Sequence, residues 1–206
     1  MKFAFLWLAI IGIASAKFSP TAQEAIVQAH NDLRSAIAKG EYVAKGQNLP
    51  PATNMLKMEW DSFLAASAQE YTEGCPSTHL HDKSYGENIH RKWSSDAPTN
   101  LDGLGVTSAK SWEKEFQKLG LSFTVYTGVK GIGHATQMAW AHSNLIGCGV
   151  KNCGRDPLKR NMYKVVVICR YKPKGNFKQT EVYNPGDTCS SCPSDTKCDS
   201  DSGLCV

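Results

Sequence analysis

Residues 131–143 read GIGHATQMAWAHS, the most informative stretch of the chain. Two glycines let the backbone turn sharply or approach another segment closely. They lead into His134, which begins a short apolar run that ends at Trp140. We therefore expect the His134 side chain to point into the molecule. A second informative stretch, VVICRYKPKGNF, occupies residues 166–177.

The start of the chain indicates export from the cell. Lys2 precedes an apolar run over residues 3–13, and the small residues Ala14-Ser15-Ala16 follow it. A charged start, a hydrophobic segment and a small-residue cleavage site are typical of a secretory signal peptide. We assign residues 1–16 to this signal and expect a secreted, extracellular protein. The rest of the sequence holds no apolar stretch long enough for a membrane span, so we expect no transmembrane segment.

The remaining 190 residues suffice for one globular core. A chain of this length buries roughly 70% of its unfolded surface. The formal charge is +4 over the whole sequence, and removal of Lys2 with the signal leaves +3. Basic runs with interleaved aromatic residues are absent from the sequence, so we expect no nucleic-acid partner.

Eight cysteines follow the signal peptide, and an even number in an exported chain predicts disulfides. Zinc is the competing interpretation for the last four, because Cys189 and Cys192 are spaced like a metal-binding pair. Export favours oxidation and no histidine joins this cluster, so we favour disulfides there as well. The count alone does not choose among the many pairings of eight cysteines.

Three stretches have the apolar spacing of helices. Apolar residues recur every three or four positions over residues 22–37, which predicts a helix that ends at Gly40. Thr21 and Glu24 have the spacing of a capping box at its start. The same periodicity predicts further helices over residues 59–72 and 106–119.

Apolar, valine-rich runs predict strands over residues 145–150 and 162–171, and a further strand begins near Tyr85. Helices come first and strands mostly later, which favours an α+β fold with helices packed on an antiparallel sheet. Residues 183–206 are instead rich in proline, glycine, serine, aspartate and cysteine. We place a domain boundary near Val182 and expect this tail to hold its shape through disulfides.

The two stretches quoted above resemble the signature motifs of the CAP superfamily, which comprises cysteine-rich secretory proteins, antigen 5 and pathogenesis-related 1 proteins. The resemblance covers residues 22–177. NMLKM at residues 54–58 and IGCGVKNC at residues 146–153 make the chain most similar to nematode SCP-like, venom-allergen-like and activation-associated secreted proteins.

This resemblance implies a three-layer α-β-α sandwich with a central antiparallel sheet. The CAP domain would span residues 17–182, and residues 183–206 would form a cysteine-rich, hinge-like tail. It also implies four disulfides: Cys75 with Cys153, Cys148 with Cys169, Cys189 with Cys198, and Cys192 with Cys205. The first closes the longest loop and is expected to contribute about 4 to 5 kcal/mol to stability.

The resemblance further implies a central cleft in which two histidines and two glutamates meet. His134 and Glu87 match the family motifs directly, and Glu115 follows Trp112 at the spacing of the second glutamate. Helix geometry alone does not choose between Glu113 and Glu115, because they fall on opposite edges of the apolar stripe. The choice of Glu115 therefore depends on the resemblance.

The remaining histidine of this set is His79, which follows Cys75 by four positions, as in the family. Relatives commonly have His-Ser there, whereas this chain has HLH over residues 79–81, so His81 is an alternative to His79. A second departure is Ala135, where the family usually has an aromatic residue. We expect a roomier cleft floor in consequence.

Two further histidines are expected to be exposed: His90, which precedes two basic residues, and His142. His30 lies at the edge of an apolar stripe and is expected to be packed or to act as a cap. Two imidazoles and two carboxylates can bind a divalent metal such as zinc, and without metal they would satisfy one another as a buried network. Serine and cysteine residues lack the setting of a nucleophile, so we expect a binding cleft and not an enzyme.

Three functions are compatible with these features. The first is a secreted, non-catalytic binding module for lipid or sterol, with a candidate groove lined by Leu121, Phe123, Val125 and Tyr126. These four residues could equally be ordinary core anchors, and their spacing argues little for sterol. The second is an immunomodulatory or signalling ligand of an extracellular receptor or channel. The third is a metal-dependent hydrolase.

Overall fold

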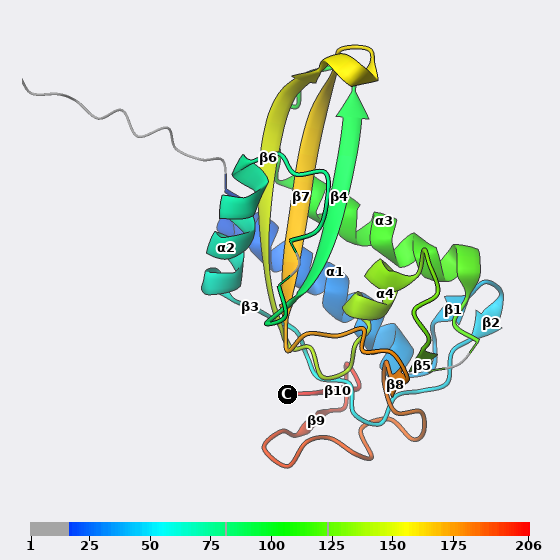
Figure 1. The fold of residues 1–206 in the computed structure, drawn as a ribbon. Helices are drawn as coiled ribbons and strands as arrows, with labels where there is room; N and C mark the ends of the chain where they lie inside the picture. The colour runs from blue at the N-terminus through cyan, green and yellow to red at the C-terminus, as the bar shows by residue number, and fades with distance from the viewer. Residues whose placement is uncertain (1–16, 81, 123) are drawn as a thin grey trace, which may run out of the picture.

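The computed structural model describes residues 17–80, 82–122 and 124–206 (Figure 1). The signal-peptide prediction concerns residues 1–16, which lie outside this description. The helices are α1 (Pro20–Ala38), α2 (Ser62–Glu73), α3 (Gly103–Leu119) and α4 (Gly133–Met138). The long strands are β4 (Gly86–Ser94), β6 (Leu145–Asp156) and β7 (Met162–Lys172). Two-residue strands complete the fold: β1 (Val43–Ala44), β2 (Gln47–Asn48), β3 (Glu59–Trp60), β5 (Val125–Tyr126), β8 (Thr180–Glu181), β9 (Cys198–Asp199) and β10 (Leu204–Cys205).

The central sheet has four strands in the order β3-β6-β7-β4. β6 and β7 form a long antiparallel hairpin joined by the 3-10 helix Pro157–Lys159, and β4 runs antiparallel to β7. β3 pairs with the first two residues of β6 in the parallel direction. The predicted antiparallel sheet is confirmed, and the structure adds one short parallel edge.

Helices cover both faces of the sheet, which makes three layers (Figure 1). Side chains of β7 alternate between these faces. Val166 and Ile168 pack with Ala68 of α2 on one face, whereas Val165 and Val167 join a larger core that includes α1, α3 and α4. Burial on both faces explains why the run from Val165 to Ile168 is continuously apolar.

The predicted capping box of the first helix is wrong. α1 begins at Pro20, and the Ser19 hydroxyl caps it by accepting a hydrogen bond from the backbone of Ala22 at 3.2 Å. Proline suits the first helical position because its fixed φ is helical and it has no N–H to satisfy. Thr21 and Glu24 therefore lie within the helix and not at its cap.

The second helix starts later than its apolar spacing predicts. Residues 59–60 form β3, and α2 begins at Ser62. Asp61 stops the helix from extending backwards because its carboxylate accepts a hydrogen bond from the Leu64 N–H at 2.7 Å, as an N-cap does. Sheet pairing thus overrides the helical periodicity at this end.

The cysteine-rich tail packs against the domain. Leu204 and Cys205 of β10 are buried, and the Cys205 N–H donates to the Met55 carbonyl at 2.8 Å. The Lys57 N–H donates in turn to the Cys205 carbonyl at 2.9 Å. Backbone pairing therefore assists the tail disulfides in holding this segment.

The structure contains four disulfides, in the pairing that the family resemblance implies: Cys75–Cys153, Cys148–Cys169, Cys189–Cys198 and Cys192–Cys205. The first anchors the loop after α2 to β6, and the second joins β6 to β7. Within the described parts of the chain, none of the helices is both long and apolar enough to cross a membrane.

Candidate functional site

Glu115 of α3 and His134 of α4 form one half of the cleft. Glu115 Oε1 lies 2.7 Å from His134 Nδ1. Its Oε2 accepts hydrogen bonds from the backbone N–H groups of His134 at 2.9 Å and Ala135 at 3.1 Å. Such amides at a helix start have no partner within the helix, so the carboxylate stabilises α4 as well as the imidazole. Trp112, one turn earlier on α3, stacks on the His134 ring with centroids 6.0 Å apart.

His79 and Glu87 form the other half. His79 Nδ1 lies 3.1 Å from Glu87 Oε1, and the Leu80 N–H donates to the same oxygen at 3.1 Å. The Glu87 side chain, on β4, is only 5% exposed, whereas that of His79 is 48% exposed. His81, the alternative to His79, lies outside the described residues.

The two halves meet across a cavity of about 380 Å³ that all four side chains line. The ring centroids of His79 and His134 are 6.2 Å apart. Ala135 is fully buried and is not among the residues that line this cavity, and the roomier cleft floor stays a prediction. Its amide acts on the site only by binding Glu115.

Arg170 of β7 belongs to the site, although no sequence motif pointed to it. Its Nε lies 3.4 Å from Glu87 Oε2, and both side chains are buried. The guanidinium also donates to the Ser67 hydroxyl and lies over the Tyr85 ring, 4.3 Å from the centroid. A charged residue within a valine-rich strand was the available signal, because a buried charge requires a partner.

A buried hydrogen-bond chain connects α1 to the cleft. His30 is fully buried, as expected, and its Nε2 lies 3.0 Å from the Tyr171 hydroxyl. The Asn88 amide donates to that hydroxyl at 3.1 Å and to the His134 carbonyl at 3.1 Å. These contacts fix the backbone at His134 from behind.

The expectation that His90 is exposed is wrong. It is half-buried on β4 and lines a cavity shared with α3. Burial lowers its pKa, and the nearby His134 acts in the same direction. Arg91 directly follows His90 on a strand, where adjacent side chains point to opposite faces, so its charge does not indicate that His90 is exposed.

Only one group in the described part of the chain places three potential ligand atoms of histidine, cysteine, aspartate or glutamate within 4.8 Å of one another: Cys189, Cys192 and Cys205. All three sulfurs belong to disulfides, so they do not offer thiolates to zinc. The cleft holds its four side chains as two pairs and not as one compact ligand cluster.

A second cavity of about 380 Å³ lies beside the connection between α3 and α4. Leu121, Val125 and Tyr126 line it, together with Leu119 and Ile132. Phe123, the fourth predicted groove residue, lies outside the described residues. The described members of the predicted set therefore share one largely apolar wall.

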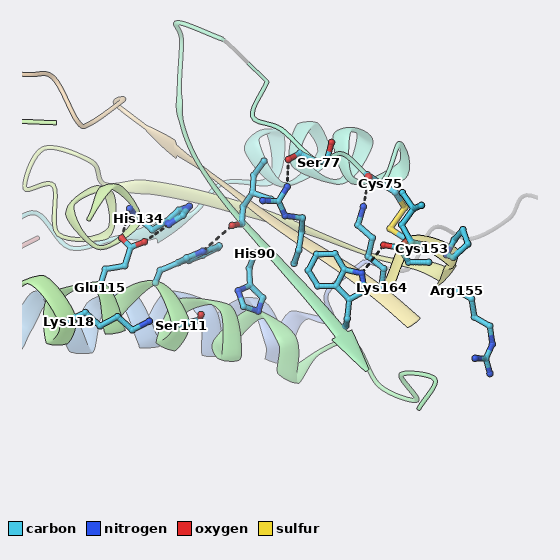
Figure 2. A pocket seen from close by; sticks show the side chains of 17 residues that line it. Cys75, Ser77, His90, Ser111, Glu115, Lys118, His134, Cys153, Arg155 and Lys164 are labelled. Atoms are coloured by element: carbon cyan, nitrogen blue, oxygen red, sulfur yellow. Dashed lines mark hydrogen bonds and ion pairs between the residues drawn. A yellow bond between two sulfur atoms is a disulfide. The ribbon is translucent and has the colours of Figure 1, made fainter. Parts of the chain in front are cut away.

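The largest cavity described, about 780 Å³, adjoins the cleft (Figure 2). Glu115 and His134 lie at one end of it, His90 and Ser111 lie between β4 and α3, and the Cys75–Cys153 disulfide lies at the far side. No sequence motif predicted this cavity, because its walls come from α3, α4, β4, β6, β7, the loop after α2 and the 3-10 helix Pro157–Lys159.

Known proteins resemble this chain over most of its length. The family model described as "Cysteine-rich secretory protein family" (CAP) matches residues 27–171. Human cysteine-rich secretory protein 3 is 31% identical over 192 residues, which are 89% of this chain and 68% of that protein. Mouse glioma pathogenesis-related protein 1 is 37% identical over 182 residues, 84% of this chain and 60% of that protein. A "CRISP/Allergen/PR-1" protein of Trittame loki is 32% identical, and the chain spans only 44% of its length.

Solved structures agree with these matches. BmVAL-1 superimposes with a TM-score of 0.82 at 30% identity, covering 93% of this chain and 97% of its own. The crystal structure of NaASP2 with Zn²⁺ has a TM-score of 0.79 at 31% identity, covering 92% and 97%. These neighbours are nematode venom allergen-like and ASP proteins. The fold and the sequence matches together show that the chain belongs to the CAP family of cysteine-rich secretory proteins.

Proposed function

We propose that this protein is a secreted, non-catalytic CAP module whose cleft binds a divalent cation such as zinc through His79 and His134. One observation carries the proposal: each imidazole directs Nδ1 at a carboxylate, Glu87 at 3.1 Å and Glu115 at 2.7 Å. A carboxylate on one ring nitrogen fixes the tautomer and leaves the other nitrogen for a metal.

The donor set fits zinc with one restriction. Imidazoles and carboxylates are its ordinary ligands. Here both carboxylates already serve protein groups, because Glu87 pairs with Arg170 and Glu115 binds the first amides of α4. The two imidazoles would hold the ion, and their carboxylates would orient them. Bound zinc would supply a Lewis-acidic centre, with weaker affinity than a four-ligand structural site.

Zinc titration by isothermal calorimetry tests this proposal. The wild-type protein should bind one Zn²⁺ per chain, and the His79→Ala/His134→Ala variant should lose that binding. His142→Ala is the matched control because His142 is exposed and outside the cleft. Equal zinc binding by the double variant would refute the site, provided that its circular dichroism shows an intact fold.

The setting of Ser143 supports a non-catalytic role. Ser143 is fully buried, and its hydroxyl donates to the Pro173 carbonyl at 2.7 Å and accepts from the Gln137 amide at 3.1 Å. Its hydroxyl is therefore held within the fold, away from the cleft cavity. A screen of ester and peptide substrates with zinc-loaded protein should show no turnover that depends on Glu87.

The apolar cavity between α3 and α4 favours a second binding function, for a fatty acyl chain. Its size falls within the usual range of small-molecule sites, and its wall is mainly aliphatic. We expect a fluorescent fatty acid to bind, and Leu121→Asp to weaken binding by about tenfold by placing a charge against the chain. Phe63→Asp, at a phenylalanine that is 85% exposed on α2, is the control. Unchanged binding in Leu121→Asp would eliminate this groove.

A receptor or channel ligand is the alternative function. It becomes the favoured one if the protein binds neither zinc nor fatty acid, since recognition would then reside on its outer surface. Cell-surface binding by the disulfide-intact protein is the measurement that addresses it.

A further inference from the structure

β4 lies at the edge of the central sheet. Along the described chain it pairs with β7 alone, over nine residues. An edge strand presents backbone N–H and C=O groups that can pair with another extended chain. Only alternate residues of β4 present these backbone groups at the free edge.

The Cys148–Cys169 pair shows which residues of β4 these are. Their Cα atoms are 4.1 Å apart, the short spacing of a non-hydrogen-bonded antiparallel pair. The backbone groups of Cys169 therefore point away from β6 and toward β4, where Asn88 is its partner. Because backbone direction alternates along a strand, His90 and Lys92 also face β7, whereas Arg91 and Trp93 face the free edge.

A contact from α3 supports this assignment. The Trp112 indole N–H reaches the Ile89 carbonyl at 3.4 Å, from a helix that packs against one face of the sheet and extends past β4 (Figure 1). Ile89 has the same alternation as Arg91 and Trp93, so its carbonyl also faces outward. α3 thus covers the edge at Ile89, and the accessible edge comprises the two residues beyond it.

The largest cavity runs along this accessible edge (Figure 2). Its wall is cationic: Arg91, Lys118, Arg155 and Lys164 line it. The two carboxylates in the wall are engaged internally. Glu115 binds the start of α4, and Asp156 accepts from the Trp93 indole at 2.9 Å. Arg91, Arg155 and Lys164 each donate to a backbone carbonyl, of Ser77, Asn161 and Cys75 respectively. The four cations outnumber the two carboxylates, so the cavity combines an open strand edge with a wall of net positive charge.

We propose that an acidic peptide binds here in extended form, adding a strand to β4 at Arg91 and Trp93. Backbone pairing supplies the register, and the basic wall selects carboxylate side chains. A second copy of this chain fits poorly, because antiparallel β4–β4 pairing would bring Arg91 and Lys92 of both copies together. This site adjoins the proposed zinc site, since Glu115 and His134 lie at one end of the same cavity, but it does not depend on zinc or fatty-acid binding.

The probe is a blocked hexapeptide of alternating glutamate and valine, titrated in buffer containing EDTA so that zinc has no influence. We expect the amide protons of Arg91 and Trp93 to become protected from hydrogen exchange, with Lys92 unchanged. A lysine–valine hexapeptide should not bind. Two further peptides carry N-methyl groups on either the odd-numbered or the even-numbered residues. One of them should not bind and the other should bind as the parent does, because only alternate peptide amides face β4.

Two pairs of variants separate backbone from charge. Arg91→Pro removes an outward N–H, which an edge strand tolerates, and should weaken binding about tenfold more than Arg91→Ala. Lys118→Glu should weaken binding, whereas Lys114→Glu, one turn away on the same helix and exposed, should not. Equal binding of both N-methylation patterns, or binding of heparin fragments in place of the peptide, would overturn strand addition.

Discussion

Glu115 shows how one side chain can serve both a helix and a site. Its two oxygens accept three hydrogen bonds, one from the His134 ring and two from the amides that open α4. Glu113 lies two residues earlier and pairs instead with Lys110 at 3.4 Å. The apolar stripe alone could not separate these two glutamates, since both lie at its edges. Which of the two glutamates reaches the cleft depends on where α4 docks.

Replacing Glu115 should therefore destabilise the fold as well as the site. Glu115→Ala leaves two helix-start amides without their carboxylate, and we expect the free energy of unfolding to fall by about 2 kcal/mol. Glu24→Ala removes an exposed helical glutamate that is not a cap. It should change the free energy of unfolding by less than about 0.5 kcal/mol. Urea unfolding measures both. Similar losses in the two variants would contradict the capping role.

His30 predicts a pH dependence of stability. Burial lowers its pKa from 6.5 to about 4, with the Ile26 carbonyl opposing this and Arg34 assisting it. The unfolded chain binds a proton near pH 6.5 but the folded chain does not, so stability should be unaffected above that pH. As the pH falls from 6.5 toward 4, the free energy of unfolding should decrease, by roughly 3 kcal/mol in all.

Urea unfolding between pH 4 and 7 measures this decrease. His30→Gln should flatten the profile in that window relative to wild type, whereas His142→Gln, at an exposed position, should leave it unchanged. If wild type and His30→Gln lose stability in parallel, other groups determine the acid sensitivity.

At the scale of elements, the decisive contact is that between α2 and β6. A Cβ placed on Gly149 would lie 2.5 Å from the Gln69 Cα, on the backbone of α2. The helix can approach the strand this closely only because the strand carries glycine there. A glycine within an apolar run suggested a strand, but the sequence did not indicate which helix crosses it.

Gly149→Ala should consequently be costly. The new methyl group meets helix backbone, which cannot move aside as a flexible side chain does, and we expect a loss of about 3 kcal/mol. Gly103→Ala, at the start of α3, meets nothing within 4 Å and should be neutral or slightly stabilising. Thermal unfolding compares the two. A neutral Gly149→Ala would mean that α2 lies farther from the sheet.

At the scale of the whole molecule, disulfides join segments that are distant in the sequence. Cys75–Cys153 spans 78 residues, whereas Cys189–Cys198 spans 9 within the tail. The Cys75–Cys153 disulfide holds the segment that carries His79 near the sheet. The tail adds its own anchorage, because β10 is buried beside Met55.

Removal of the long-range disulfide should cost the most. By loop entropy, Cys75→Ala/Cys153→Ala should lower the free energy of unfolding by about 4.5 kcal/mol, and Cys189→Ala/Cys198→Ala by about 2.6 kcal/mol. Urea unfolding of both double variants measures the order. A larger loss for the tail pair would show that packing of the tail, and not loop length, determines its contribution.

The sequence by itself determined the family, the α+β class and the approximate strands, because motif residues and apolar periodicity are local properties of the chain. It also named Glu87 and His134 as cleft residues through the motifs that contain them. Only the tertiary structure decided that Arg170 pairs with Glu87, that His90 is half-buried and that Arg91 and Trp93 face a free edge. Those facts depend on strand register and helix docking, which bring together side chains that no local pattern relates.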